Sequence, residues 1–164
     1  MKIVLAADHA GFPLKEFIKG CLTEEGVIHA DFGTFNADPV DYPDLAFKAA
    51  SAVQQGDFAR GILVCGTGIG VAIVANKLPG IRAALCNDLF SARYAREHND
   101  ANILTLGSRI IQEELAREIV KVFLKTPFAG GRHLQRIKKI EELERQLCRP
   151  DEGLAGREGS SDNL

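Results

Sequence analysis

The stretch from residue 61 to residue 75, GILVCGTGIGVAIVA, constrains the fold of this chain more than any other. Its apolar start, Ile62 to Val64, is typical of a strand that is buried on both faces of a sheet. Glycines then follow at alternate positions, and small apolar residues resume at Val71. Because glycine lets the backbone turn sharply, this spacing predicts a strand, a tight turn and the first turns of a helix.

Cys65 lies where this strand should end, next to Gly66, Gly68 and Gly70. Unpaired main-chain amides and the positive end of a helix dipole meet at such a turn and favour anions. A thiol placed there should ionise more readily, since its negative form is the one that is stabilised. The alternative is an inert core cysteine, which is common for free Cys. The three glycines favour the anion site, because a plain turn does not need them.

The same spacing disfavours two other glycine loops. No Gly-Lys-Ser/Thr follows, so the nucleotide P-loop is excluded. The dinucleotide pattern requires its third glycine one position later, where this chain has Val71. That pattern also follows the first strand of its fold, whereas the glycines of this chain follow the third predicted strand. A dinucleotide-dependent enzyme that uses Asp88 as its ribose-binding acid is therefore disfavoured.

Five predicted strands alternate with helices along the chain. The strands are expected at 2–7, 27–32, 61–65, 82–86 and 103–106, with helices between them and a last helix that ends near 148. Asp44 and Asp88 are predicted N-caps. The alternation predicts an α/β fold, a doubly wound five-stranded parallel sheet in a Rossmann-like three-layer sandwich. Residues 1–148 should form one domain that includes the C-terminal helix, and the polar segment 149–164 a disordered tail.

Polar residues follow three of the predicted strands where each strand ends. They are Asp8-His9, Cys65 with its glycines, and Gly107-Ser108-Arg109. In open parallel sheets ligands bind beyond the carboxyl ends of the strands, so we expect a site at this edge.

The last helix carries an apolar stripe, and we expect a partner subunit to pack on it. The stripe consists of Leu134, Ile137, Ile140, Leu143 and Leu147.

Composition narrows the class of protein. The 164 residues suit one domain, and a net charge of −2 gives no reason to expect a nucleic acid or membrane partner. The apolar run at the N-terminus is too short for a signal peptide, and the four scattered cysteines read as reduced thiols, so we expect a cytoplasmic protein. No His-x-His or His-x-x-x-His pair occurs, so no metal site is predicted.

Six short motifs together resemble one known family, the type B ribose-5-phosphate isomerases, which also contains galactose-6-phosphate and allose-6-phosphate isomerases. The resemblance covers about residues 1–148, in order and with matching intervals. The motifs are Asp8-His9-Ala10-Gly11, Asp41-Tyr42-Pro43, Cys65-Gly66-Thr67-Gly68-Ile69-Gly70, His98-Asn99-Asp100, Gly107-Ser108-Arg109 and Gly130-Gly131-Arg132-His133 with Arg136.

The resemblance implies an aldose–ketose isomerase that needs no metal or other cofactor. It would interconvert ribose 5-phosphate and ribulose 5-phosphate, a reaction of the pentose phosphate pathway, through a cis-enediolate. Cys65 matches the base that moves a proton between C2 and C1, and His98 the residue that opens the furanose ring, with Thr67 or Asp8 assisting. The resemblance also implies a homodimer with sites between its subunits, or a dimer of dimers.

The remaining implied site residues bind the substrate. The amides of Gly66, Gly68 and Gly70, with Asn99, would stabilise the enediolate oxygens. The other assignments are phosphate binding for His9, Arg109, Arg132 and Arg136, and hydroxyl binding for Tyr42 and Asp8. From the residues alone, Arg132 with Arg136 could be a solvated pair, as such pairs usually are, although the two glycines before them leave room for a ligand. His133 could cap a helix or meet phosphate.

Two alternatives stay open on the sequence. One is a 6-phosphohexose isomerase acting on allose 6-phosphate or galactose 6-phosphate, for which Cys65 and the glycine loop would serve equally well. The other is a non-catalytic, flavodoxin-like module that binds a phosphosugar or a nucleotide.

Overall fold

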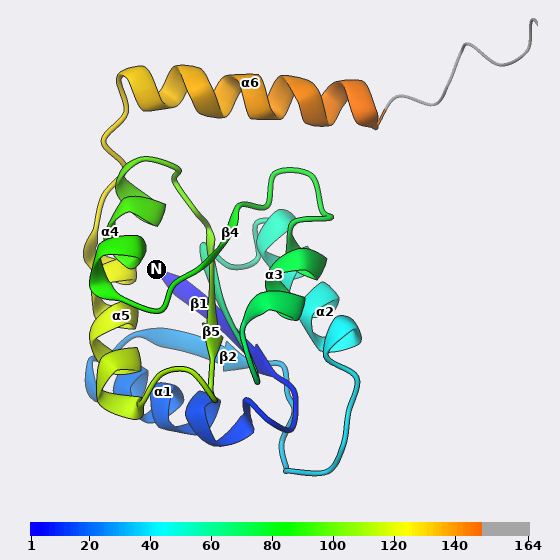
Figure 1. Ribbon diagram of the computed structural model, residues 1–164, viewed down its shortest axis with the longest axis vertical. Coiled ribbons are helices and arrows are strands. Elements are labelled where there is room, and N and C mark those ends of the chain that lie inside the picture. Colours follow the sequence, from blue (N-terminus) through cyan, green and yellow to red (C-terminus); the bar gives the residue numbers. More distant parts are fainter. Residues whose placement is uncertain (149–164) are drawn as a thin grey trace, which may run out of the picture.

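The computed structural model describes residues 1–148, so the predicted tail at 149–164 lies outside the described residues. Strands and helices alternate through the core and a sixth helix follows (Figure 1). In chain order the elements are β1 (Lys2–Ala7), α1 (Phe12–Glu24), β2 (Ile28–Asp31), α2 (Tyr42–Gln54), β3 (Arg60–Cys65), α3 (Ile69–Ala75), β4 (Ala83–Leu85), α4 (Leu89–Glu97), β5 (Ile103–Gly107), α5 (Glu113–Lys125) and α6 (Arg132–Leu147).

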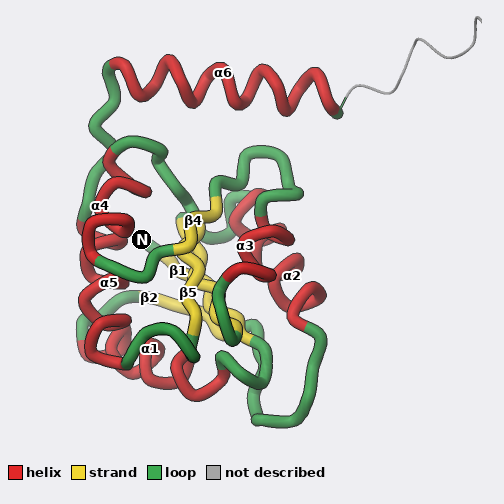
Figure 2. Tube along the Cα trace, in the orientation of Figure 1, coloured by secondary structure: helices red, strands yellow, loops and turns green. Residues whose placement is uncertain are grey.

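All paired strands are parallel, and their order across the sheet is β2-β1-β3-β5-β4. Helices cover both faces, as Figure 2 shows with the strands between two groups of helices. The prediction of a doubly wound five-stranded parallel sheet is confirmed.

Alternate side chains of the central strands enter different cores, which explains the continuous apolar runs in the sequence. In β1, Ile3 and Leu5 pack with α1, α4 and α5, whereas Val4 and Ala6 pack with α2 and α3. β3 repeats the pattern with Ile62 in the first core and Leu63 in the second. β1 and β3 are therefore buried on both faces.

One helix start differs from its prediction. α2 begins at Tyr42 with Asp41 as its N-cap, so the prediction of Asp44 as the cap is wrong. Proline lacks an amide hydrogen and is favoured in the first turn of a helix, where Pro43 lies. Asp88 does cap α4, as predicted.

The sheet has its topological switch point between β1 and β3. The chain leaves β1 toward β2 on one side and later returns to β3 on the other, so the connections run in opposite directions from this point. Asp8 and Cys65, at the ends of these two strands, flank the place where ligands bind in open α/β sheets.

α6 lies across the opposite end of the molecule, where the strands begin (Figure 1). No helix within residues 1–148 has the length and apolar character needed to cross a membrane.

Candidate active site

The loops that follow β1, β3 and β5 are hydrogen-bonded to one another. The Ser108 hydroxyl donates to the carbonyl oxygen of Ala10 at 2.8 Å and to that of Cys65 at 3.2 Å. The Ser108 amide also donates to the Cys65 carbonyl at 2.9 Å. The expectation that the three polar clusters share one edge of the sheet is confirmed. Ser108 itself was given no role from the sequence, although its place after a predicted strand was the available signal.

The thiol of Cys65 accepts a hydrogen bond from the main chain of the glycine turn. The Gly68 amide lies 3.1 Å from Cys65 Sγ, and the residue is only 5% exposed. Gly68 has a φ of 77°, and a Cβ there would lie 2.5 Å from Leu85 Cδ1 and 2.8 Å from the Leu106 carbonyl carbon. Only glycine fits this position without a shift of the backbone.

Two of the other loop glycines leave room for predicted site residues. A Cβ on Gly66 would stand 3.4 Å from Arg109 Nε, and one on Gly70 would stand 2.7 Å from the ring of Tyr42. Arg109 and Tyr42 therefore pack directly on the loop that holds Cys65. Thr67, between these glycines, is exposed, and its hydroxyl accepts from the Ile69 amide at 3.4 Å.

Asp8 and His9 have defined hydrogen-bonding states. Asp8 is 8% exposed, and its Oδ1 accepts from the Gly11 amide at 2.8 Å. His9 Nδ1 accepts from the Val40 amide at 3.2 Å. A ring nitrogen that accepts cannot carry a proton, so the proton of the neutral His9 ring is on Nε2. His9 can thus donate one hydrogen bond to an anion.

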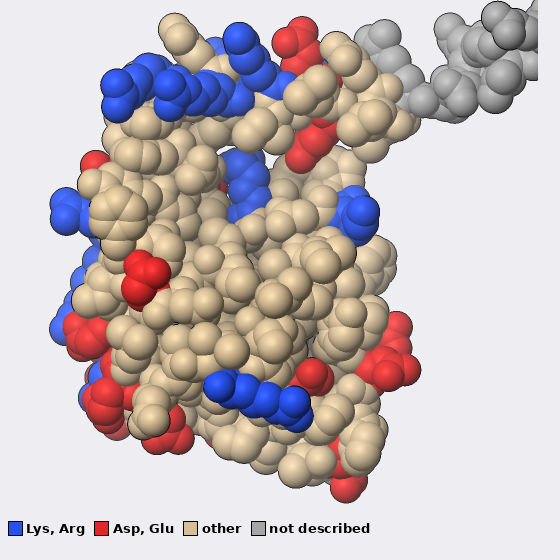
Figure 3. Space-filling model, viewed as in Figure 1, with Lys and Arg blue, Asp and Glu red and all other residues tan. Residues whose placement is uncertain are grey.

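His98, Asn99, Arg132 and Arg136 form a second group around the start of α6. His98 is the C-cap of α4, and its ring stacks on that of His133 with centroids 4.1 Å apart and an interplanar angle of 9°. The ring of Tyr94 also packs against His98, with the two ring centroids 4.4 Å apart. Arg132 and Arg136 occupy the first turns of α6, where Figure 3 shows Lys and Arg gathered.

The two groups lie at opposite ends of the sheet. Cys65 pairs with Gly107 at the end of β5, whereas His98 precedes the start of β5 at Ile103. Five residues of β5 at 3.3 Å each span about 16 Å. One chain therefore brings together Cys65, Asp8, His9, Tyr42, Thr67, Arg109 and the loop glycines, but it does not bring His98, Asn99, Arg132 or Arg136 to them.

The sequence did not decide between two roles for His133, and the structure stacks its ring on that of His98. Burial lowers the pKa of His133, and the nearby charges of His98, Arg132 and Arg136 lower it further, against an opposing effect of Glu97. A neutral His133 ring can stack on His98 without adding a positive charge next to the two arginines.

Cys86 provides a contrast with Cys65. Its thiol is fully buried and lies 3.7 Å from the Ala84 carbonyl oxygen, to which it donates. Burial raises the pKa of Cys86 to about 11. Cys86 therefore keeps its proton near neutral pH, whereas Cys65 Sγ accepts a hydrogen bond from the main chain.

Within residues 1–148, no group of three or more His, Cys, Asp or Glu side chains is arranged to hold a metal ion.

The comparisons with known proteins agree with this geometry. Residues 3–140 match the family described as Ribose/Galactose Isomerase, and the chain belongs to this family of isomerases. The chain is 46% identical to ribose-5-phosphate isomerase B of Escherichia coli over 145 residues, which cover 88% of this chain and 97% of the relative.

Two solved structures also resemble this chain and carry names from the same family. Ribose-5-phosphate isomerase B of Clostridium thermocellum superposes with a TM-score of 0.88 at 50% identity, covering 90% of this chain and 99% of the other. The enzyme of Thermotoga maritima gives a TM-score of 0.84 at 52% identity, with 86% and 97% covered.

Proposed function

We propose that this chain interconverts ribose 5-phosphate and ribulose 5-phosphate, with Cys65 as the base. The observation that carries the proposal is the hydrogen bond from the Gly68 amide to Cys65 Sγ, at the switch point of the sheet. This bond supports a thiolate, because a main-chain donor stabilises a negative sulfur. The named activity of the E. coli relative and of both solved structures supports the choice of substrate.

The reaction needs one base that serves two neighbouring carbons. The Cys65 thiolate takes the proton from C2 of the open-chain aldose, and the electron pair forms the C1–C2 double bond of a cis-enediolate. As the double bond forms, the carbonyl electron pair of the aldose moves onto O1. The same thiol then returns its proton to C1, while the O2 hydroxyl proton passes to O1, so that O1 becomes a hydroxyl and O2 becomes the ketose carbonyl oxygen. The Gly68 amide already donates to Cys65 Sγ, so the amides of Gly66 and Gly70, with Asn99, stabilise the oxygen on which negative charge develops.

Two further tasks complete the proposal. His98 transfers the proton that opens the furanose ring, with Thr67 or Asp8 assisting. Tyr42 and Asp8 bind sugar hydroxyls, and the 5-phosphate is held by Arg109, Arg132, Arg136 and the Nε2–H of His9.

This assignment requires two copies of the chain at each site. Cys65 and His98 lie about 16 Å apart or more along the sheet of one chain, too far to act on one pentose. In a symmetric dimer, the His98 group of one subunit would meet the Cys65 group of its partner, and the reverse would hold at the second site. The exposed apolar side chains of α6 are the surface that we assign to this contact.

A coupled isomerase assay tests the chemistry. We expect turnover of ribose 5-phosphate that survives chelator treatment, and loss of about 1,000-fold or more in kcat for Cys65→Ala. Cys86→Ala is the matched control, because it removes a buried thiol outside the site and should leave kcat unchanged. Full activity of Cys65→Ala, or activity that vanishes with EDTA and returns with a divalent ion, would disprove the mechanism.

Complementation between two inactive variants tests the shared site. Cys65→Ala and His98→Asn are each purified, mixed under conditions that exchange subunits, and assayed. Half of the dimers would then be mixed, and each mixed dimer would hold one site with both changes and one intact site. Recovery of about a quarter of wild-type activity is expected from this symmetry. No recovery despite verified exchange would place both residues of a site in the same chain.

The family description favours one second candidate, an isomerase of a 6-phosphohexose. The same assay with allose 6-phosphate and galactose 6-phosphate compares the substrates by kcat/KM. A higher value for either hexose phosphate than for ribose 5-phosphate would replace the first candidate.

A further inference from the structure

The turn between α4 and β5 carries His98 and Asn99, and its shape depends on the next residue, Asp100. Asp100 has a φ of 44°, the only positive φ of a non-glycine residue within residues 1–148. Side chains other than glycine disfavour this region, and Asp and Asn tolerate it best. Contacts from the rest of the fold must therefore hold the turn in this conformation.

Two arginines from different parts of the chain hold the Asp100 carboxylate. Arg96 Nη1 of α4 lies 2.7 Å from Oδ1, and Nη2 of Arg82, just before β4, lies 3.2 Å from Oδ2. The same arginines bind the main chain of the turn. Arg82 Nε donates to the Asn99 carbonyl at 3.0 Å, and Arg96 Nη1 donates to the Ala101 carbonyl at 2.6 Å. We call Asp100, Arg82 and Arg96 the Asp100 clamp.

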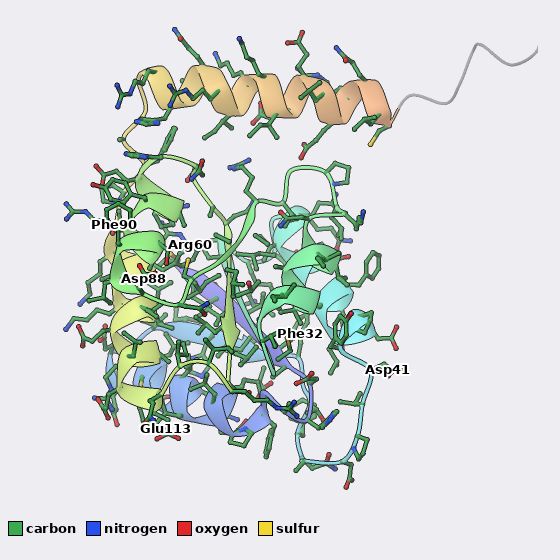
Figure 4. The ribbon with its side chains drawn as sticks, in the orientation of Figure 1. Phe32, Asp41, Arg60, Asp88, Phe90 and Glu113 are labelled. Carbon is green, nitrogen blue, oxygen red and sulfur yellow. The ribbon has the colours of Figure 1, made fainter. Side chains whose placement is uncertain are left out.

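The surroundings make this carboxylate hard to replace. Arg96 is only 6% exposed, and its guanidinium lies 5.7 Å from the ring centre of Phe123. Arg60, labelled in Figure 4, lies 5.6 Å from the same ring. Burial and the charge of Arg96 together lower the pKa of Arg60 to about 10, against an opposing effect of Asp100, which raises it. Without the Asp100 carboxylate, the guanidinium groups of Arg60 and Arg96 would lie in a poorly solvated region with less negative charge to balance them.

The clamp is connected to His98 and Asn99 through one short turn. The His98 amide donates to the Tyr94 carbonyl at 3.0 Å, and the Asn99 side chain donates to the same carbonyl at 3.3 Å. The His98 ring is aligned by its neighbours Tyr94 and His133. A rotation of the peptide between Asn99 and Asp100 would therefore displace both predicted site residues.

We propose that Asp100 is a positioning residue, whose clamp with Arg82 and Arg96 holds His98 and Asn99 in the orientation that isomerisation needs. This inference rests on the proposed function and adds to it three residues that need not touch the substrate. A misplacement of about 1 Å in catalytic groups lowers rates by about 100-fold, so a small change in the turn has a measurable effect.

Three variants separate this role from simple stabilisation. Asp100→Asn keeps the size and the tolerance of positive φ, and it removes the charge. Arg82→Gln opens the clamp from the other side and leaves the Arg96 pair intact, which guards against a variant that fails to fold. Arg93→Gln is the control, because it breaks a pair with the same i,i+4 spacing on α4, Arg93 with Glu97 at 3.2 Å, outside the clamp.

The measurements are kcat and KM for ribose 5-phosphate and the NMR resonances of the His98 imidazole in the full chain. For Asp100→Asn and Arg82→Gln we expect kcat to fall by about 10- to 100-fold with KM within about threefold, since the phosphate ligands are untouched. The His98 resonances should move as its ring leaves the stacked position. Arg93→Gln should stay within about twofold of wild type in kcat.

Two results would overturn the inference. One is a lower melting temperature with unchanged kcat, measured well below that temperature; the other is unchanged His98 resonances in both clamp variants, whatever the value of kcat. If the wild-type chain does not isomerise ribose 5-phosphate, the proposed function fails. The His98 resonances then decide alone whether the clamp holds the turn: a shift in the clamp variants supports it, and no shift rejects it.

Discussion

Gly68 is the residue on which the geometry at Cys65 depends most directly. Replacing it with alanine would place a Cβ against Leu85 and Leu106 and would strain a backbone with φ of 77°. The turn must then move, and the Gly68 amide leaves Cys65 Sγ. We expect Gly68→Ala to lower kcat at least about tenfold and the free energy of unfolding by about 1–3 kcal/mol.

Gly20 supplies the control for this substitution. It lies within α1, and a Cβ there would have no atom within 4 Å. Gly20→Ala should raise the free energy of unfolding by about 0.5–1 kcal/mol, since alanine favours a helix, and should not change activity. Urea denaturation and the isomerase assay check both variants, and wild-type kcat in Gly68→Ala would contradict the proposed role of the turn.

Single residues show what the sequence could and could not predict about the site. The alternate glycines predicted the turn at Cys65, because few other backbones need glycine at that spacing. The clamp was not predictable, since nothing local marks Asp100 as a residue with positive φ. The place of His133 was also out of reach, because its stacking partner His98 is 35 positions away and the contact depends on how α6 packs.

Among the secondary-structure elements, α1 and β2 are joined by an ion pair. Lys15 of α1 is completely buried, and its Nζ lies 2.5 Å from Asp31 Oδ2 at the end of β2. Lys19 also reaches Asp31, at 3.0 Å. Burial alone would raise the pKa of Asp31, but hydrogen bonds from Lys15, the Gly33 amide and Lys19 outweigh it and leave the pKa below the ordinary value of 3.8.

This pair predicts a pH dependence of stability. A carboxyl with a lowered pKa in the folded state stabilises the fold above its unfolded pKa, and the contribution is lost as pH falls through the folded value. The free energy of unfolding should therefore decrease below about pH 4, where the unfolded carboxyl binds a proton first. Urea denaturation between pH 6 and pH 3 measures it.

Two variants isolate the contribution of Asp31. Asp31→Asn should be less stable at pH 6 and should show a shallower loss on acidification. Asp38→Asn changes an exposed carboxylate and should keep the wild-type profile. An Asp31→Asn profile parallel to that of wild type would refute the assignment.

The N-terminus of α4 offers a second prediction about an element. Asp88 Oδ1 accepts from the Ser91 amide at 2.7 Å, whereas Asp41 is the N-cap of α2 without a side-chain hydrogen bond. Figure 4 labels both residues. Asp88→Ala should lower the free energy of unfolding by about 0.5–2 kcal/mol, and Asp41→Ala by less. Equal losses in urea denaturation would show that the hydrogen bond is not the cause.

The elements were largely predictable because each strand is a continuous apolar run bounded by polar residues or glycine. β1 matches its prediction at both ends, and β3 extends it by one residue at Arg60. α2 was placed too late, since Asp41 and Asp44 are both plausible caps and only the position of Pro43 within the first turn distinguishes them.

On the scale of the whole molecule, α6 is the least covered element. Ile137 is 5% exposed, but four other apolar side chains of this helix are between 43% and 85% exposed: Leu134, Ile140, Leu143 and Leu147. Apolar side chains gathered along one helix are typical of a protein interface. A partner subunit over this stripe stays a prediction, because the arrangement of two chains leaves no local signal in the sequence.

Charge on this stripe should separate the subunits. We expect Leu143→Lys to shift the chain from dimer toward monomer in sedimentation velocity, with activity falling in parallel, since the shared site is lost. Gln146→Lys adds the same charge to α6 at a position outside the stripe and should remain dimeric. A wild-type chain that sediments as a monomer and still isomerises would contradict the shared site.

The length of β5 also affects how activity depends on the amount of protein. If groups at opposite ends of each chain must meet across two chains, a newly made copy is inert until it encounters another. Specific activity would then be constant at high concentration and fall on dilution below the dissociation constant, with a lag before activity returns. A cell holding only a few copies would have less enzyme than their number suggests.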